Sequence, residues 1–449
     1  MSPTVIESRH DHQKAARVLC APRWASADKR VVLALVIFGL SSVISLKISG
    51  RLALSNIGQL LAASILLTVR PRISMAGMLA IAAVPCSAIA AAAYQWWDKS
   101  LPIHWPHIAY FTIVALLIER MIAIAPRVRA IGRAFDILLW TLLIYFLGWA
   151  MSDPEPFTHR IAFGFDDKSH AVLYISFFSF IALIRLKHWS RYPIAIGLAV
   201  MAAMTTSRLV GIVLPLLVLA LAIDLISRQG RAGRMGIGAV ACASVVAVAA
   251  LIAIFPERFM VLERFRPHSF FDDAIIAHLL LIQFAFELKV ADFATIVLGT
   301  GPGSFASALA ANGIDVSLLG VIDPGAFEHL QDGTAPVHSS HATVLVEFPL
   351  WIFIGYVVGL LTLAWRLVKV RAWVTLCMFT SLQLSVAFYS SINEAFYWVM
   401  MAWAIHASLV GEGRSHAATA TIQIDRQRRP RSAPEFVRDD VPSLRPTTS

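Results

Sequence analysis

The sequence predicts an all-α, polytopic integral membrane protein with about twelve transmembrane helices, and three observations lead to this class. Of the 449 residues, 58% are hydrophobic and only 15% are charged, whereas a soluble domain typically carries about 25% charged residues. The apolar residues gather in long runs, each near the length that crosses a bilayer as a helix. Along the chain, the connections between these runs alternate between many and few Lys and Arg residues.

Twelve apolar windows are the expected spans, with boundaries good to about three residues. They cover residues 31–48, 52–69, 73–95, 108–125, 131–150, 170–188, 192–206, 209–226, 236–255, 341–365, 372–389 and 394–410. The chain is thereby divided into a polar segment (1–30), nine spans (31–255), one large loop (256–340), three further spans (341–410) and a basic tail (411–449). The tail has no apolar periodicity, so we expect it to be disordered.

The charge distribution predicts the orientation. If the N-terminus lies in the cytoplasm and the spans alternate, 28 of the 38 Lys and Arg residues fall on the cytoplasmic side. This is the bias that the positive-inside rule describes, so we expect both termini inside and the large loop outside. The net charge of +10 then indicates orientation rather than nucleic-acid binding. The four cysteines lie in the N-terminal segment or in apolar runs, which argues against a disulfide framework or a zinc ribbon.

The large loop carries signs of order. Residues 272–298 begin with paired Asp and have an apolar stripe, which predicts an amphipathic helix near the membrane surface. A turn follows that contains Gly299, Gly301, Gly303 and Ser304. Exposed amides in such a turn can hold an anion, while the alternative is a plain turn that begins the next helix. The sequence of a nucleotide-binding P-loop is absent from the chain.

Arginines at the outer face are candidates for binding an anion. Arg208 follows Ser207 in a short link between two expected spans, and its guanidinium offers fixed charge and a bidentate fork for phosphate. Arg258, Arg264 and Arg266 cluster at the start of the large loop. Simple anchoring at the membrane interface, or contact with lipid headgroups, is the alternative for these residues.

Two histidines and a carboxylate lie where the loop re-enters the membrane. His338 and His341 are followed by Glu347, which falls inside the expected span at 341–365. Histidine is the usual proton acceptor near neutral pH, and ionisable groups within spans are functional candidates. A helix cap or an interface residue is the alternative reading of either histidine. A weaker candidate, for a divalent metal, is Asp153-Pro154-Glu155, and Cys/His spacing for zinc is absent.

At these residues the chain resembles the O-antigen ligase and O-antigen polymerase superfamily of bacterial envelope proteins. The resemblance covers roughly residues 200–365 and the overall topology. Ser207-Arg208, between two spans, is similar to the family's S-R pair. The run 298–305 resembles its glycine-rich turn near the end of the large outer loop.

The third motif lies at the end of the loop. His338-Ser339, with Glu347 nine residues after the histidine, resembles the family's H-[NSQ] pair and distal Glu. By that spacing His338, rather than His341, takes the motif position. The chain departs from the pattern because Pro349 and Ile352 replace glycines after the Glu, and because the second loop arginine is missing. These departures favour a divergent polysaccharide polymerase over a strict ligase.

The resemblance implies a membrane glycosyltransferase with a GT-C-like fold in the bacterial inner membrane. Such proteins move a glycan from an undecaprenyl-diphosphate carrier to a sugar hydroxyl at the outer face, in exopolysaccharide, capsule or O-antigen biosynthesis. The implied partners are the lipid-linked oligosaccharide, the growing glycan chain, membrane lipid and a chain-length regulator protein. No cofactor, metal or nucleic acid is implied.

The resemblance also implies roles for the candidate residues. Arg208, with Arg264 or Arg266, would neutralise the departing diphosphate. His338 would orient or deprotonate the attacking hydroxyl, with Glu347 or His341 orienting it.

Other function classes stay open at the level of sequence. A ligase would pass the glycan to lipid A-core or to another acceptor. A lipid-linked oligosaccharide flippase would also have about twelve spans, but transporters usually place charges near the bilayer midplane, whereas the candidate residues here crowd the outer face. An assembly scaffold without chemistry is a third alternative.

Overall fold

The computed structural model describes residues 26–43, 47–49, 52–70, 72–152, 161–165, 167–187, 189–228, 273–333 and 335–411. Several sequence predictions lie outside these residues. They are the span at 236–255, the acidic triplet at 153–155, the loop arginines Arg258, Arg264 and Arg266, nearly all of the N-terminal segment and the tail beyond Gly411.

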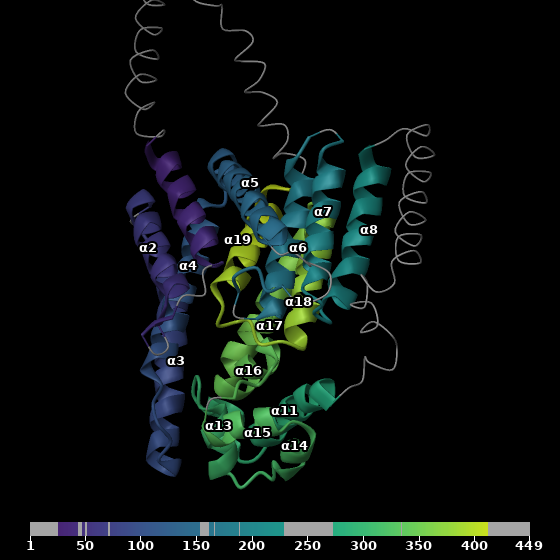
Figure 1. Cartoon of the computed structure of the whole chain (residues 1–449). Coiled ribbons are helices and arrows are strands. Elements are labelled where there is room, and N and C mark those ends of the chain that lie inside the picture. The colour runs from purple at the N-terminus through teal and green to yellow at the C-terminus, as the bar shows by residue number, and fades with distance from the viewer. Residues whose placement is uncertain are drawn as a thin grey trace, which may run out of the picture.

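A bundle of apolar helices makes up most of the described chain (Figure 1). Residues 26–41 are helical. After a short antiparallel pair of strands, β1 (Lys47–Ser49) and β2 (Leu52–Ala53), come α2 (Leu54–Val69), α3 (Met75–Lys99), α4 (Trp105–Ile124), α5 (Val128–Ser152), α6 (Lys168–Arg185), α7 (Arg191–Met204) and α8 (Val210–Arg228). The bundle is completed by α17 (Leu350–Lys369), α18 (Trp373–Ala387) and α19 (Ala395–Val410).

Six of these helices, α3, α4, α5, α6, α8 and α17, are long and apolar enough to cross a membrane, and α2, α7, α18 and α19 are shorter apolar helices. The protein is therefore an all-α, multi-pass membrane protein, as the composition predicts.

Burial separates central helices from peripheral ones. In the most apolar window of α6, 83% of the residues are buried inside the protein, whereas in α17 only 11% are. A helix that is apolar all round and buried all round belongs in the middle of a bundle, and one that leaves its apolar side chains uncovered faces lipid. The helix α19 is also central, because it packs against α2, α4, α6, α17 and α18.

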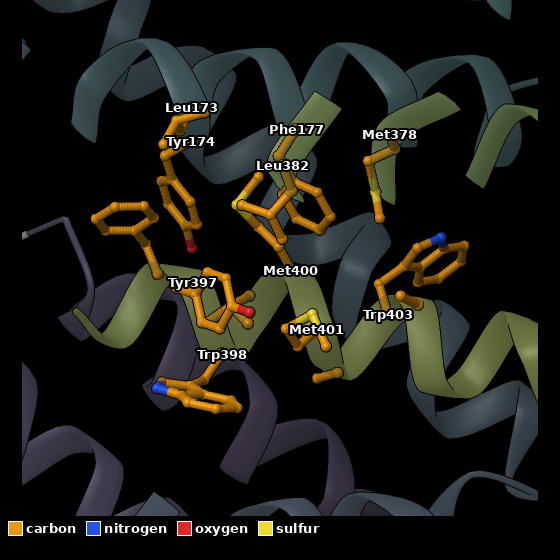
Figure 2. Packing of buried hydrophobic residues seen from close by; sticks show 14 of the residues in the cluster. Leu173, Tyr174, Phe177, Met378, Leu382, Tyr397, Trp398, Met400, Met401 and Trp403 are labelled. Carbon is orange, nitrogen blue, oxygen red and sulfur yellow. The ribbon is translucent and has the colours of Figure 1, made fainter. Parts of the chain in front are cut away.

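Large aromatic and sulfur-containing side chains fill the space around α19 (Figure 2). Met400 of α19 points toward α6, and the Tyr397 hydroxyl lies 3.5 Å from the Tyr356 hydroxyl on α17. The indole of Trp403 lies 4.9 Å from the Phe135 ring on α5, between ring centroids, and its Nε1 donates to the Thr375 hydroxyl at 3.3 Å. This pairing satisfies the one polar atom of a side chain that is 1% exposed.

The expected span at 341–365 is wrong at its start. The structure has a separate short helix, α16 (Ser340–Glu347), before α17 begins at Leu350. The break is explained by Pro349, because the residue before a proline is pushed out of the α region. Phe348 accordingly has an extended backbone, with φ −109° and ψ 158°. Glu347 therefore precedes the candidate membrane span.

The described part of the large loop folds into short helices at one end of the bundle (Figure 1). They are α11 (Asp273–Lys289), α12 (Phe293–Leu298), α13 (Phe305–Ala311), α14 (Ser317–Ile322) and α15 (Pro324–Gln331). The single helix predicted over 272–298 is interrupted, because Asp292 accepts a hydrogen bond from the Thr295 amide at 2.7 Å and caps α12.

The loop helices have a hydrophobic core of their own. Leu281, Phe284 and Leu288 of α11 pack with Phe305 and Leu309 of α13. This core also includes Val346 of α16. The loop is thus a small packed unit joined to the bundle through α16.

At the opposite end of the bundle, two ion pairs tie separate segments together. Arg191 contacts Asp224 at 3.3 Å, with both side chains buried, at 9% and 2% exposed. Arg127 contacts Asp28 at 2.9 Å, with the two side chains 22% and 43% exposed. Burial makes the first pair costly to break, since a lone buried charge is left behind.

We expect Asp224→Asn to lower the free energy of unfolding by about 3–5 kcal/mol, because it removes the counter-charge of a buried guanidinium. Asp28→Asn is the matched control and is expected to cost about 0–1 kcal/mol, as exposed pairs do. Unfolding of the purified variants in detergent measures both. Equal losses would contradict the distinction between the two pairs.

Candidate functional site

Two histidines from distant parts of the chain stack at the end of the bundle that carries the loop. His338 precedes α16 and His278 lies on α11, and their ring centroids are 4.3 Å apart with the planes inclined by 11°. Within the described residues, ring contacts rather than hydrogen bonds hold the His338 imidazole.

Tyr389 and Asp167 border this stack. The Tyr389 ring meets both imidazoles edge-on, at centroid distances of 5.9 Å from His278 and 6.3 Å from His338. Its hydroxyl donates a hydrogen bond to Asp167. Asp167 also caps α6 by accepting from the Ser169 amide at 2.6 Å.

The Ser207-Arg208 turn is adjacent. The Ser207 hydroxyl lies 3.1 Å from the Ser169 hydroxyl, and the charge of Arg208 acts on both His278 and Lys168. The positive charges of Arg208 and Lys168 thus act on one another, and the Asp167 carboxylate acts on Lys168 as a counter-charge. Positive charge at such a place favours the binding of an anion.

The environment keeps the histidines neutral. Burial lowers the pKa of His338 to about 4, and the neighbouring His278 adds to this shift. Burial and the charge of Arg208 lower the pKa of His278. For Asp167, burial raises the pKa, but the hydrogen bonds from Tyr389 and the Ser169 amide outweigh it and hold the pKa below its ordinary value. At neutral pH the site therefore combines neutral imidazoles, which can accept a proton, with one carboxylate.

Backbone strain marks the same two places in the chain. His338 has φ +55° and Thr206, just before the Ser207-Arg208 pair, has φ +56°. Left-handed backbone is uncommon for residues other than glycine, and such conformations cost about 1–3 kcal/mol and cluster at functional sites. The strain therefore supports a functional assignment for both turns.

The glycine turn packs against α16. The amides of Thr300 and Gly301 donate to the carbonyls of Val346 and Glu347, each at 3.0 Å. Gly299 has φ +82°, and a Cβ there would lie 2.7 Å from the Phe348 carbonyl. This position thus requires glycine both for its conformation and for its close approach to another backbone.

The Glu347 carboxyl is the group that faces the amides beyond this turn. Its carboxylate accepts hydrogen bonds from the backbone amides of Gly303 and Phe305, at the start of α13. Burial raises the pKa of Glu347 to about 7, against the opposing effect of these two hydrogen bonds. Ser304, between them, turns its hydroxyl inward to the carbonyls of Thr300 and Gly301, each at 2.6 Å.

His341 faces the bundle. Its Nδ1 lies 3.0 Å from the Tyr356 hydroxyl on α17, and its Nε2 lies 3.1 Å from the Gln383 carbonyl on α18. In the part of the chain that the structure describes, His341 and Glu347 thus have partners other than His338. Of the residues selected from the sequence, the structure brings His338 and Arg208 to one site, while the glycine turn, Glu347 and His341 lie around α16.

Four residues of the site were missed by sequence reasoning: Asp167, Lys168, His278 and Tyr389. A weak signal existed for Asp167, since paired Asp before an apolar window is a typical helix start. His278 and Tyr389 carry no local signal, because their role depends on long-range packing. Among the described residues, no group of three or more His, Cys, Asp or Glu side chains is arranged to hold a metal ion.

The fold defines a multi-pass, all-helical membrane protein. A scan against models of protein families found no match for the chain, and a search of curated proteins found none either. Evidence for the function therefore comes from the residues of the site and their geometry.

We expect Gly299→Ala to loosen the loop from α16, because the added Cβ meets the Phe348 backbone. Gly313→Ala is the matched control: this glycine also has positive φ, +64°, but a Cβ there meets nothing within 4 Å. Both changes bear a conformational cost, which is larger at Gly299 because its φ of 82° and ψ of −178° lie in a region that is essentially restricted to glycine. Only Gly299→Ala should also speed protease cleavage between residues 273 and 333. Equal cleavage rates would contradict the proposed contact.

Proposed function

We propose that this protein is a membrane glycosyltransferase that polymerises undecaprenyl-diphosphate-linked oligosaccharide repeat units at the outer face of the bacterial inner membrane. The observation that carries the proposal is that the His278 ring, which stacks on the neutral His338, also experiences the charge of Arg208, while the Ser207 hydroxyl contacts Ser169. His338 and the Ser207-Arg208 turn belong to two of the three motifs by which the sequence resembles the O-antigen ligase and polymerase superfamily. The third, the glycine turn, lies one helix away.

The chemistry needs a base and a cation. A sugar hydroxyl oxygen of the acceptor attacks the anomeric carbon of the donor, and the bond from that carbon to the diphosphate breaks. His338 takes the hydroxyl proton, and the electron pair leaves with undecaprenyl diphosphate. Because this is a single displacement, the anomeric configuration is inverted.

Lys168 joins Arg208 as a candidate ligand of the diphosphate. The charge of Arg208 acts on Lys168, and a bound anion would add to the counter-charge that Asp167 supplies. Fixed positive charge that is already in place stabilises the negative charge that develops as the diphosphate departs. Arg264 and Arg266 keep the role that the resemblance implies, although they lie outside the described residues.

The glycine turn and Glu347 then serve as supports. Because the amides of Gly303 and Phe305 interact with Glu347, the turn holds α16 in place. The position of His338, which precedes α16, is held with it. His341 anchors the same helix to α17 and α18.

The proposal includes twelve spans with both termini in the cytoplasm, which is the arrangement that the basic residues favour. The donor's polyprenyl tail would lie against exposed apolar helices such as α17. The growing glycan and a chain-length regulator protein are the further partners that the resemblance implies. Neither a cofactor nor a metal is needed, because the diphosphate is already a good leaving group.

Two alternatives remain. A ligase would use the same donor with a different acceptor. A flippase would need mid-span positions to open to each side in turn. A scan of single cysteines for labelling from either side distinguishes a flippase, since alternating access would be seen only in a transporter.

Deletion of the gene, followed by mass analysis of undecaprenyl-diphosphate-linked glycans and of the surface polymer, tests the reaction. We expect single repeat units to accumulate on the carrier while the polymer is lost. Long polymer stranded on the carrier, with an unmodified acceptor, would indicate a ligase and contradict the polymerase assignment.

We expect His338→Asn to lower turnover by about 10²–10⁴-fold, the usual contribution of a general base. Asparagine tolerates the left-handed backbone that this position requires, so the protein should still fold. Arg208→Gln should also abolish turnover. Arg366→Gln is the matched control, because that arginine is exposed at the cytoplasmic end of α17. Wild-type activity in both His338→Asn and Arg208→Gln would refute the proposal.

A further inference from the structure

Tyr389 lies on the segment between α18 and α19 and presents its ring edge to both stacked imidazoles. Its plane is inclined by 68° to His278 and by 76° to His338. Edge-to-face contact between rings is a favourable geometry. Because one ring contacts both members of the stack, it limits how far either imidazole can tilt or slide.

Tyr389 is itself fixed at two points. Its backbone carbonyl accepts from the Ser340 hydroxyl at 3.3 Å, and the amides of Ser391 and Ile392, two and three residues later, donate to the same hydroxyl oxygen at 2.9 and 3.0 Å. Ser340 is the first residue of α16. The backbone of Tyr389 is therefore tied to the helix that follows His338, while its hydroxyl is tied to Asp167 before α6.

Hydrogen bonds continue from Asp167 to the arginine turn. The carboxylate accepts from the Ser169 amide, and the Ser169 hydroxyl meets the hydroxyl of Ser207, the residue before Arg208. A continuous path thus runs from the imidazole stack through Tyr389, Asp167 and Ser169 to the turn. The proposed reaction assigns no other role to these hydrogen bonds.

We propose that Tyr389 and Asp167 are positioning residues, whose hydrogen bond holds the His278–His338 stack at a fixed place beside the Ser207-Arg208 turn. The inference rests on the proposed function, because it assigns the pair to the reaction of His338 and Arg208. The pair acts through these residues, so its loss misplaces the base relative to the diphosphate ligand. Misplacement of this kind lowers turnover more than it weakens binding.

Asp167 also contributes to the electrostatic environment of His338. The groups that act on His338 from the surrounding elements are His278 of α11, Asp167 before α6, Asp323 and His329 at and within α15, and Tyr389. The two carboxylates raise the pKa of His338, and the two histidines lower it. His338 must be neutral to accept a proton, so activity is lost as pH falls through this pKa. Removing the charge of Asp167 lowers the pKa and moves the acidic limb of the pH–rate profile to lower pH.

The first test is Tyr389→Phe, which keeps the ring and removes the hydroxyl. With a lipid-linked oligosaccharide donor and the purified full-length protein, we expect kcat to fall by about 10- to 100-fold, as loss of a hydrogen bond to a charged group would produce. KM should stay within about twofold. Tyr94→Phe, at an exposed tyrosine of α3, is the control and should leave both constants unchanged.

The second test is Asp167→Asn. Asparagine caps a helix as well as aspartate does, so the start of α6 is preserved while the charge is removed. We expect the acidic limb to move to lower pH, and NMR titration of labelled His338, which needs no turnover, to give the same direction. Asp315→Asn is the matched control, because Asp315 also accepts from the amide two residues later, at 2.9 Å. Asp167→Glu, which restores the charge, should return the limb toward its original position.

Unchanged kcat in Tyr389→Phe would overturn the positioning role. It would also be overturned if Asp167→Asn changed neither the pH of the acidic limb nor the pKa of His338 measured by NMR. Each of these results leaves the proposed function intact provided that His338→Asn is inactive. An active His338→Asn would instead overturn the proposed function, and the NMR titration would still decide whether Asp167 acts on His338.

Discussion

The C-terminal end of α16 is the junction on which the rest of the described structure depends. The last carbonyls of a helix have no partner within it, and here the loop supplies three. Thr300 and Gly301 donate amides to Val346 and Glu347, and the Lys289 ammonium donates to the Phe348 carbonyl at 3.3 Å. The Glu347 side chain returns the interaction by accepting from amides at the start of α13. The loop and the bundle are thus joined by reciprocal hydrogen bonds between buried groups, which are costly to leave unpaired.

This junction determines where the chemistry of the site can be. It fixes α16, whose first residues follow His338. It also fixes α11, the helix that carries His278, because Val346 of α16 and Leu281 of α11 belong to one hydrophobic core. The imidazole stack therefore forms between two segments that the junction holds together. Asp167 and Tyr389 then attach the stack to the bundle. A base held in this way needs little reorganisation when the substrate reacts, which is the condition for effective catalysis by preplaced groups.

Burial gives the site its electrostatic character. Burial lowers the pKa of His338 to about 4, so the imidazole is neutral over the physiological range. The same partial burial strengthens the effect of the nearby cations on an anionic ligand, because charges are screened less away from water.

The sequence by itself determined the membrane class, most helix positions and two members of the site. Apolar runs of bilayer length can only be buried in lipid or in other helices, so composition and period were sufficient. Ser207-Arg208 and His338 were found because a charged or basic group at the end of a span is costly and conspicuous. The predicted span at 341–365 began too early because the apolar run continues through the break between α16 and α17 at Pro349. Only the tertiary structure decided that Glu347 binds the loop, and that His278, Tyr389 and Asp167 surround His338. These contacts join residues far apart in the chain, and packing between helices, which leaves no local pattern in a sequence, brings them together.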